Sequence, residues 1–155
     1  MTTIELCMTF SSDDTCRELL ERLRWPNGPV CPRCCNPNPA RLANSSKLIY
    51  CKDCDYQFTV TVNTIFHNSH LPLIKWLTAT FLLCETRKGM SHNEIKRTLE
   101  VSYKTAWYLC HRIRAAMALA EKNVRFKRRN SKALFLDTLQ HMITADPLTY
   151  ERLTD

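Results

Sequence analysis

The stretch from Cys31 to Cys54 decides how this sequence folds: Cys31-Pro32-Arg33-Cys34 is followed, after sixteen intervening residues, by Cys51-Lys52-Asp53-Cys54. Each C-x2-C pair presents two thiolates at the spacing that a tetrahedral zinc ion needs, with bonds of about 2.3 Å. The pattern therefore predicts a zinc ribbon with one Zn²⁺ bound by Cys31, Cys34, Cys51 and Cys54. Four thiolates leave no open coordination position, so we expect this zinc to be structural and not catalytic.

Disulfides or free thiols are the alternative interpretation of the same cysteines. Disulfides suit secreted chains, but the N-terminus lacks the basic start and the uninterrupted apolar run of a signal peptide. We therefore expect a cytoplasmic chain with reduced thiols. Cys35, beside the ligand Cys34, is expected to stay free. The other cysteines are interpreted as small buried hydrophobes: Cys7, Cys16, Cys84 and Cys110.

The composition bounds both the size of the core and the kind of partner. At 155 residues and 45% hydrophobic content, the chain has room for one ordinary domain or two small ones. A formal charge of +7 predicts a polyanionic partner, and the positive excess is concentrated in residues 71–132. The longest apolar run, residues 71–84, contains Pro72 and Lys75 and is shorter than the roughly 20 residues that span a bilayer. We expect no membrane span.

The first half of the chain predicts one helix and then a small sheet. Residues 11–24 begin with capping residues and carry apolar side chains at helical spacing, so they predict a short amphipathic helix. Trp25 follows it and is expected to pack against the ribbon. Residues 41–42 and 48–50 predict a hairpin, and the alternating apolar residues of 56–62 predict a third strand.

The second half predicts helices. An apolar stripe over residues 71–88 ends at Gly89, and Ser91-His92-Asn93-Glu94 has the form of a capping box that begins the next helix. A turn at residues 100–102 leads into a long helix through about Ala120. Two such helices joined by a short turn, after a third helix, predict a helix-turn-helix domain. The alternative is a plain helical hairpin with solvated charges, which the clustered positive charge disfavours.

A helical wheel divides the second helix of this pair, the predicted recognition helix, into two faces. The packed face is predicted to comprise Ala106, Leu109, Cys110, Ile113 and Met117. The outward face is predicted to contact base edges in a major groove through Tyr103, Lys104, Thr105, Tyr108 and Arg112. Trp107 is expected to pack within the fold. A basic run is predicted to bind DNA phosphates through Arg125, Lys127, Arg128 and Arg129.

The predicted architecture is a small α+β fold, with a zinc ribbon of short antiparallel strands followed by a mainly α helix-turn-helix domain. The predicted boundaries are residues 1–28 for the N-terminal helix, 29–66 for the ribbon, 67–120 for the helix-turn-helix domain and 121–155 for a basic linker with a C-terminal helix. That last helix, at residues 133–143, is apolar enough to pack back on the core or to pair with a second chain.

Five stretches carry a resemblance to a known family: Cys31-Pro32-Arg33-Cys34, Cys51-Lys52-Asp53-Cys54-Asp55-Tyr56-Gln57-Phe58-Thr59-Val60, Thr64-Ile65-Phe66-His67, Leu73-Ile74-Lys75-Trp76 and Val101-Ser102-Tyr103-Lys104-Thr105-Ala106-Trp107. In this order, over about residues 10–118, they resemble insertion-sequence transposases that begin with a zinc ribbon. The resemblance implies that the ribbon and the helix-turn-helix bind double-stranded DNA at the ends of the element in DNA transposition. It also implies a following domain of the RNase H type, in which three acidic residues and divalent metal cut and join strands.

The chain departs from that family pattern after residues 112–117, where the acidic motif is expected and the sequence instead becomes basic. Asp137, Asp146 and Glu151 fall within fifteen positions, whereas a two-metal site needs carboxylates from separate structural elements. We therefore expect no catalytic residues and no enzymatic activity in this chain as it stands. The predicted function is that of a DNA-binding protein derived from a transposase and truncated before its catalytic domain.

The alternative function is a small transcriptional regulator that uses the same zinc ribbon and helix-turn-helix. A palindromic site and a stable dimer would favour it. An active transposase is disfavoured by the missing acidic scaffold, and a ribbon that binds only protein is disfavoured by the clustered positive charge. The expected partners are double-stranded DNA and either a second copy or a full-length transposase, in a nucleoid-associated location.

Overall fold

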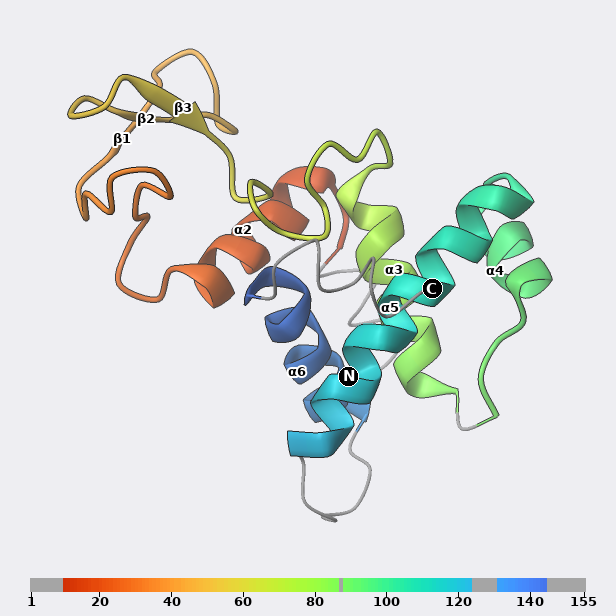
Figure 1. The fold of residues 1–155 in the computed structure, drawn as a ribbon. Helices are drawn as coiled ribbons and strands as arrows, with labels where there is room; N and C mark the ends of the chain where they lie inside the picture. Colours follow the sequence, from red (N-terminus) through yellow and green to blue (C-terminus); the bar gives the residue numbers. More distant parts are fainter. Residues whose placement is uncertain (1–9, 87, 124–130, 145–155) are drawn as a thin grey trace.

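The computed structural model describes residues 10–86, 88–123 and 131–144, and Figure 1 shows a small three-stranded ribbon standing at one end of a helical body. The predicted small α+β fold is confirmed. Along the chain the described elements are α2 (Asp13–Arg24), β1 (Ala40–Arg41), β2 (Ile49–Cys51), β3 (Tyr56–Phe58), α3 (Leu73–Glu85), α4 (His92–Leu99), α5 (Tyr103–Asn123) and α6 (Ser131–Thr144). None of the helices in this part of the chain is long and apolar enough to cross a bilayer.

The sheet is antiparallel in the order β1-β2-β3, and each of its first two strands lies within one residue of the predicted position. The third strand is shorter than predicted, because β3 ends at Phe58 and does not continue to Val62. Backbone turns replace the strand, since the N–H of Val62 donates to the carbonyl of Thr59 at 3.2 Å. Val60, which the alternating pattern assigned to the ribbon, is instead buried with the helical core.

Helix α2 begins where the predicted capping residues lie. Ser12 is the N-cap, and it exchanges side-chain and backbone hydrogen bonds with Thr15 in a capping box. Its neighbour Asp13 accepts a hydrogen bond from the backbone N–H of Ile74 at 3.0 Å, which ties the start of α2 to the start of α3. Leu20 and Cys16 point into the core. This arrangement anchors the segment that precedes the ribbon on the helical body.

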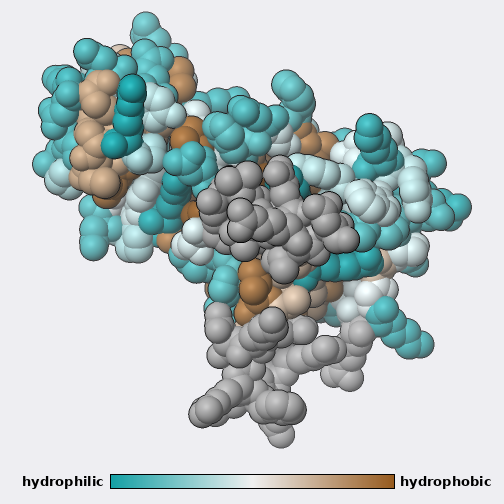
Figure 2. Space-filling view, in the orientation of Figure 1, coloured by the Kyte–Doolittle hydropathy of each residue, from teal (hydrophilic) through white to brown (hydrophobic). Residues whose placement is uncertain are grey.

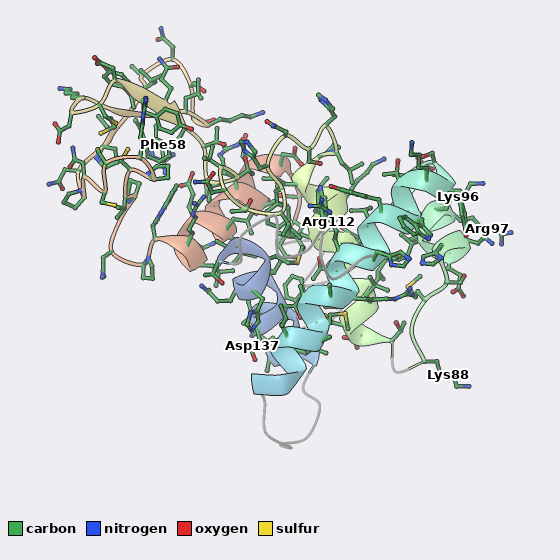
Figure 3. The ribbon with its side chains drawn as sticks, viewed as in Figure 1. Phe58, Lys88, Lys96, Arg97, Arg112 and Asp137 are labelled. Atoms are coloured by element: carbon green, nitrogen blue, oxygen red, sulfur yellow. The ribbon has the colours of Figure 1, made fainter. Side chains whose placement is uncertain are left out.

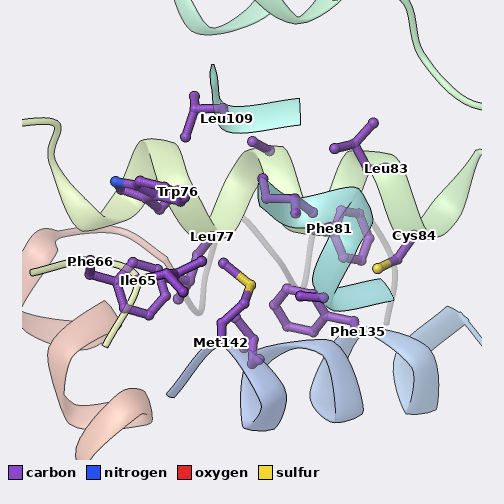
Figure 4. Close-up of a cluster of buried hydrophobic side chains, with 14 of the residues drawn as sticks. Ile65, Phe66, Trp76, Leu77, Phe81, Leu83, Cys84, Leu109, Phe135 and Met142 are labelled. Carbon is purple, nitrogen blue, oxygen red and sulfur yellow. The ribbon is translucent and has the colours of Figure 1, made fainter. Parts of the chain in front are cut away.

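The main core lies between α3, α5 and α6, as Figure 4 shows for the side chains around Met142 and Phe135. The ring of Phe135 meets that of Phe81 edge to face, with centroids 5.8 Å apart. The carbonyl of Met142 accepts a hydrogen bond from the N–H of Ile65 at 3.3 Å, so α6 also holds the segment that follows the ribbon. Of the two arrangements open for the C-terminal apolar helix, packing back on the core is the one observed.

Helices α4 and α5 form the predicted pair, joined by the three residues Glu100 to Ser102. The capping box at the start of α4 is present, since the N–H of Ser91 donates to a carboxylate oxygen of Glu94 at 2.7 Å and Ser91 Oγ accepts from the N–H of Glu94. Glu100 turns the chain in a left-handed conformation with φ of 51°. Ser102 Oγ then accepts from the N–H of Thr105 at 3.1 Å. Local capping therefore fixes the angle at which α5 leaves the turn.

Two separate hydrophobic clusters underlie this architecture. The helical core includes residues from α2, α3, α5 and α6, whereas the ribbon cluster is built on Cys31, Ile49, Cys51 and Phe58. The domain boundaries predicted near residues 28, 66 and 120 imply segments that fold independently, and they stay a prediction.

Candidate metal centre and nucleic-acid surface

The four predicted ligands converge at the tip of the ribbon. The Sγ atoms of Cys31, Cys34, Cys51 and Cys54 all lie within 4.8 Å of one another. Cys31 Sγ is 3.6 Å from Cys54 Sγ, and Cys34 Sγ is 3.4 Å from Cys51 Sγ. A tetrahedral ion with metal–sulfur bonds of about 2.3 Å places its sulfurs about 3.8 Å apart. The sulfur cage therefore fits one metal ion held by four cysteines.

The backbone of each knuckle turns in the same way. The residue after each second cysteine is left-handed, with φ of 60° at Cys35 and 53° at Asp55. The N–H of Cys35 donates to the carbonyl of Cys31 at 2.9 Å, which closes the first knuckle. Cys35 itself is exposed and lies outside the four-sulfur cluster, as predicted. Its position is thus used for the turn, where glycine is the residue that adopts this conformation most easily.

The surroundings of the sulfurs shift the pKa values of Cys31 and Cys54 in opposite directions. Desolvation alone would raise the pKa of Cys31, but the backbone N–H groups of Cys34 and Arg33 and the Cys54 thiol donate to its sulfur and lower that pKa to about 7. Desolvation, followed by the neighbouring thiols, raises the pKa of Cys54 to about 12. The Cys31 sulfur is therefore readily a thiolate near neutral pH, whereas the Cys54 thiol releases its proton when metal binds.

Three of the four cysteines that the sequence predicted to be buried lie in the described residues, and all three are buried. Cys16 and Cys110 are fully enclosed and Cys84 is 9% exposed, while Cys7 lies outside the described residues. Burial, with a smaller contribution from the charge of Asp13, raises the pKa of Cys16 to about 11. Burial also raises the pKa of Cys110. The thiols of Cys16 and Cys110 therefore stay protonated at neutral pH, and all three cysteines serve as small buried side chains.

Aromatic contacts hold the ribbon to the end of α2. The ring of Trp25 meets that of Phe58 edge to face, with centroids 6.0 Å apart, which confirms the predicted packing of Trp25 on the ribbon. Tyr56 stacks on Phe58 at 6.0 Å, and the Arg33 guanidinium lies 5.7 Å from the Tyr56 ring. The Arg24 guanidinium, beside Trp25, donates to the carbonyl of Val60. The metal centre is thus connected to the helical body by packed rings.

The outward face of α5 carries the residues that the helical wheel selected. Tyr103, Lys104 and Tyr108 are exposed, and Thr105 and Arg112 are half-buried. The Arg112 guanidinium lies 4.5 Å from the centre of the Tyr108 ring, in a cation–π contact. On the opposite face, Met117 is partly buried and packs against the core, and four predicted residues are fully buried: Ala106, Leu109, Cys110 and Ile113. The division of this helix into two faces is confirmed.

Trp107 was predicted to pack within the fold, and this prediction was wrong. Its side chain is 43% exposed, and its ring lies against that of His111 with centroids 4.0 Å apart. Ala106 and Leu109 occupy the inward positions on this part of α5, so Trp107 lies on the outward side. The helical wheel already indicated that Trp107 is exposed. At about 100° per residue, Trp107 lies about 60° from the outward Lys104, and His111 lies about 20° from Lys104.

A shallow hollow of about 460 Å³ lies beside this face, between α5 and the loop that follows the ribbon. Its walls are His67 to Leu71 on one side and Lys104, Thr105 and Tyr108 on the other, with Trp76 beneath. The indole N–H of Trp76 donates to Ser69 Oγ at 3.0 Å, which fixes the loop against α3. The polar loop that follows the motif at residues 64–67 therefore lies next to α5.

Positive side chains continue from α5 onto α4. Lys96 and Arg97 are exposed, and Figure 3 shows both pointing outward from α4, away from Asp137 on α6. In Figure 2 this part of the molecule is mostly teal and white, so its surface is polar. The predicted phosphate-binding residues Arg125, Lys127, Arg128 and Arg129 lie outside the described residues, as do Asp146 and Glu151.

Comparison with known proteins identifies the domain family of the segment that contains the sulfur cage. Residues 11–57 match the model of the transposase zinc-ribbon domain of the IS1595 type. This segment is a transposase zinc-ribbon domain. The chain is also similar to a transposon protein: 111 residues are 32% identical to an uncharacterized protein in transposable element ISH50 of Halobacterium salinarum. The alignment covers 70% of this chain and 37% of that protein. No solved structure matches the chain.

The transposase zinc-ribbon domain, as matched, begins with α2 and ends inside β3, so it contains all four clustered cysteines. The resemblance of this chain to zinc-ribbon transposases is therefore confirmed for the segment that holds the sulfur cage, and the chain spans about a third of the transposable-element protein that it matches. The helix-turn-helix pair follows the transposase zinc-ribbon domain along the chain and packs on the core to which α2 belongs.

Proposed function

We propose that this transposase-derived chain binds double-stranded DNA at the ends of an insertion sequence, with one structural Zn²⁺ in the ribbon and the N-terminal half of α5 in the major groove. The observation that carries the proposal is the exposed, capped start of α5 in a helix-turn-helix that follows a transposase zinc-ribbon domain. Recognition helices of this kind contact base edges with their N-terminal residues.

The choice of zinc is supported by the ligand set. Four thiolates in a tetrahedral arrangement are typical of structural zinc, and they leave no site where a substrate could coordinate. The two buried sulfurs, of Cys31 and Cys51, also form part of the small ribbon cluster. The metal is thus assigned to folding the ribbon and not to catalysis.

Base reading by α5 is supported by the kind and placement of its outward donors. Lys104 is exposed in the first turn of α5, where an extended ammonium can donate to guanine O6 and N7. Arg112 is steadied over Tyr108, so its guanidinium is held close to the same face. Lys96 and Arg97 on α4 extend the positive surface, where they can contact phosphates beside the groove.

The test is a selection from a randomised duplex library, followed by titration of the selected and of a random duplex. We expect Lys104→Ala and Arg112→Ala each to weaken binding to the selected duplex by about 1–3 kcal/mol and to change random-sequence binding little. Lys88→Ala is the matched control, because it removes one exposed charge that lies outside α4 and α5. If both α5 variants bind the two duplexes like the parent, α5 is a plain helix with solvated charges.

A further inference from the structure

Three rings form a stack beside the outward face of α5. Trp107 and His111 have centroids 4.0 Å apart with planes inclined by 42°, and His111 stacks on His92 of α4 at 5.7 Å with planes inclined by 17°. We call Trp107, His111 and His92 the ring stack. Tyr103 meets its α4 end, edge to face with His92 at 6.1 Å. The ring stack therefore bridges the two helices of the helix-turn-helix.

The ring stack is fixed from behind by Arg114. One guanidinium nitrogen, Nη1, lies 3.1 Å from His92 Nε2, and the other, Nη2, donates to the carbonyl of Met90 at 2.6 Å. Desolvation, followed by the charge of Arg114, lowers the pKa of His92, so its imidazole is neutral and can accept a hydrogen bond from Arg114. His92 is thereby held in place, and His111 lies between it and Trp107.

Trp107 offers an exposed ring beside the ring stack, as does Tyr103, which is 49% exposed and meets His92 edge to face. Trp107 is 43% exposed although His111 covers one face, so the exposed area belongs to its other face and its edge. Tyr108 is also exposed, but Arg112 lies over its ring and Trp76 meets it edge to face at 6.2 Å. An exposed indole with one face open is the kind of aromatic surface on which a base can stack, and here a tilted imidazole supports it from the other side.

The side chains around the ring stack are mostly positive, which indicates the kind of partner that this surface binds. Lys104 and Arg114 on α5 are exposed, as are Lys96 and Arg97 on α4. The acidic residues of α4 and its cap are Glu94 and Glu100, and the Glu94 carboxylate is already bound to the N–H of Ser91. A polyanion with aromatic groups therefore suits this surface better than an acidic or apolar protein.

A base within a duplex offers only its edges to the major groove, whereas an unpaired base offers its whole face. We propose, on the basis of the DNA binding proposed above, that Trp107 stacks on an unpaired base of the bound DNA. The chain then recognises a DNA end that carries an unstacked nucleotide in preference to the same duplex with every base paired. Stacking of one base on an aromatic side chain is worth roughly 5- to 150-fold in affinity.

The test compares three DNAs of one selected duplex sequence: blunt, with an overhang of four adenines, and with an overhang of four abasic nucleotides. The abasic overhang keeps the phosphates and removes the bases. We expect the parent protein to bind the adenine overhang about 5- to 150-fold more tightly than the abasic one. Trp107→Ala should bind the adenine and the abasic overhang with equal affinity, and Trp107→Phe should keep part of the preference. Quenching of tryptophan fluorescence by the adenine overhang should disappear in Trp107→Phe.

Any other result of this comparison rejects either the stacking site or the proposed function. Equal affinity of the parent for both overhangs, with blunt-duplex binding intact, overturns the stacking site and leaves the proposed function standing. A Trp107→Ala protein that melts like the parent but loses affinity for all three DNAs equally makes Trp107 a duplex contact and also overturns the stacking site. A change of oligomeric state in Trp107→Ala, with the preference retained, shows a protein interface instead. Failure of the parent to bind any of the three rejects the proposed function itself.

Discussion

Removing the metal is expected to unfold the ribbon and to leave the helical body folded. Apart from its cysteines, the ribbon cluster buries only Ile49 and Phe58 completely. Burial of two such side chains contributes about 3–6 kcal/mol, whereas a structural zinc ion contributes about 10–16 kcal/mol in small zinc domains. Metal binding therefore stabilises the ribbon more than its apolar packing does, and so small an apolar cluster cannot offset the loss of the metal.

The assay is a ¹⁵N-correlated NMR spectrum of the full chain before and after chelation, with metal analysis of the purified protein. We expect one zinc per chain, and loss of dispersion for residues 31–58 after chelation or in Cys51→Ser. Residues of the helical core, such as Leu109 and Phe135, should keep their positions, because they belong to a separate cluster. A Cys35→Ser control should behave like the parent, since this cysteine lies outside the sulfur cage. Absence of stoichiometric zinc, or an unchanged ribbon spectrum in Cys51→Ser, would refute this reasoning.

Three further predictions concern the rest of the chain. These 155 residues should neither nick nor join DNA with magnesium or manganese, because Asp137 lies on a helix and not on a sheet scaffold; metal-dependent nicking that is lost in Asp137→Ala would contradict this. Neutralising Arg128 and Arg129 should weaken selected and random DNA alike and should lower the salt slope by about one unit for each lost phosphate contact, measured by titration at several salt concentrations; an unchanged slope would count against phosphate contacts there. The lowered pKa of His92 means that the unfolded chain takes up a proton at a higher pH than the folded chain, so stability should fall as pH falls through about 6.5. Melting curves of the parent and of His92→Gln should converge toward acidic pH, and a constant difference would remove the role assigned to the Arg114 contact.

The features that the sequence predicted correctly depend on local chemistry. The spacing of Cys31, Cys34, Cys51 and Cys54 is enough to specify a sulfur cage, and Ser91 with Glu94 is enough to begin α4. The buried face of α5 also follows from periodicity alone. The DNA-contacting residues selected from the other face stay a prediction.

The features that the sequence did not predict depend on tertiary packing. Val60 is drawn into the helical core, so the alternating pattern of residues 56–62 does not continue as a strand. Trp107 is an aromatic residue that local preference assigns to a core, but the inner face of α5 is already filled by small and branched side chains. The apolar character of α6 predicted burial without identifying what covers it, and only the fold shows that α3 and α5 do.

The most direct test of the central claim is a titration of ¹⁵N-labelled protein with the selected duplex, read residue by residue. If α5 reads DNA, the largest chemical-shift changes should fall at residues 103–112, with smaller changes at Lys96 and Arg97 on α4. Changes confined to the ribbon or to α6, with residues 103–112 unaffected, would contradict the assignment of the DNA-reading surface.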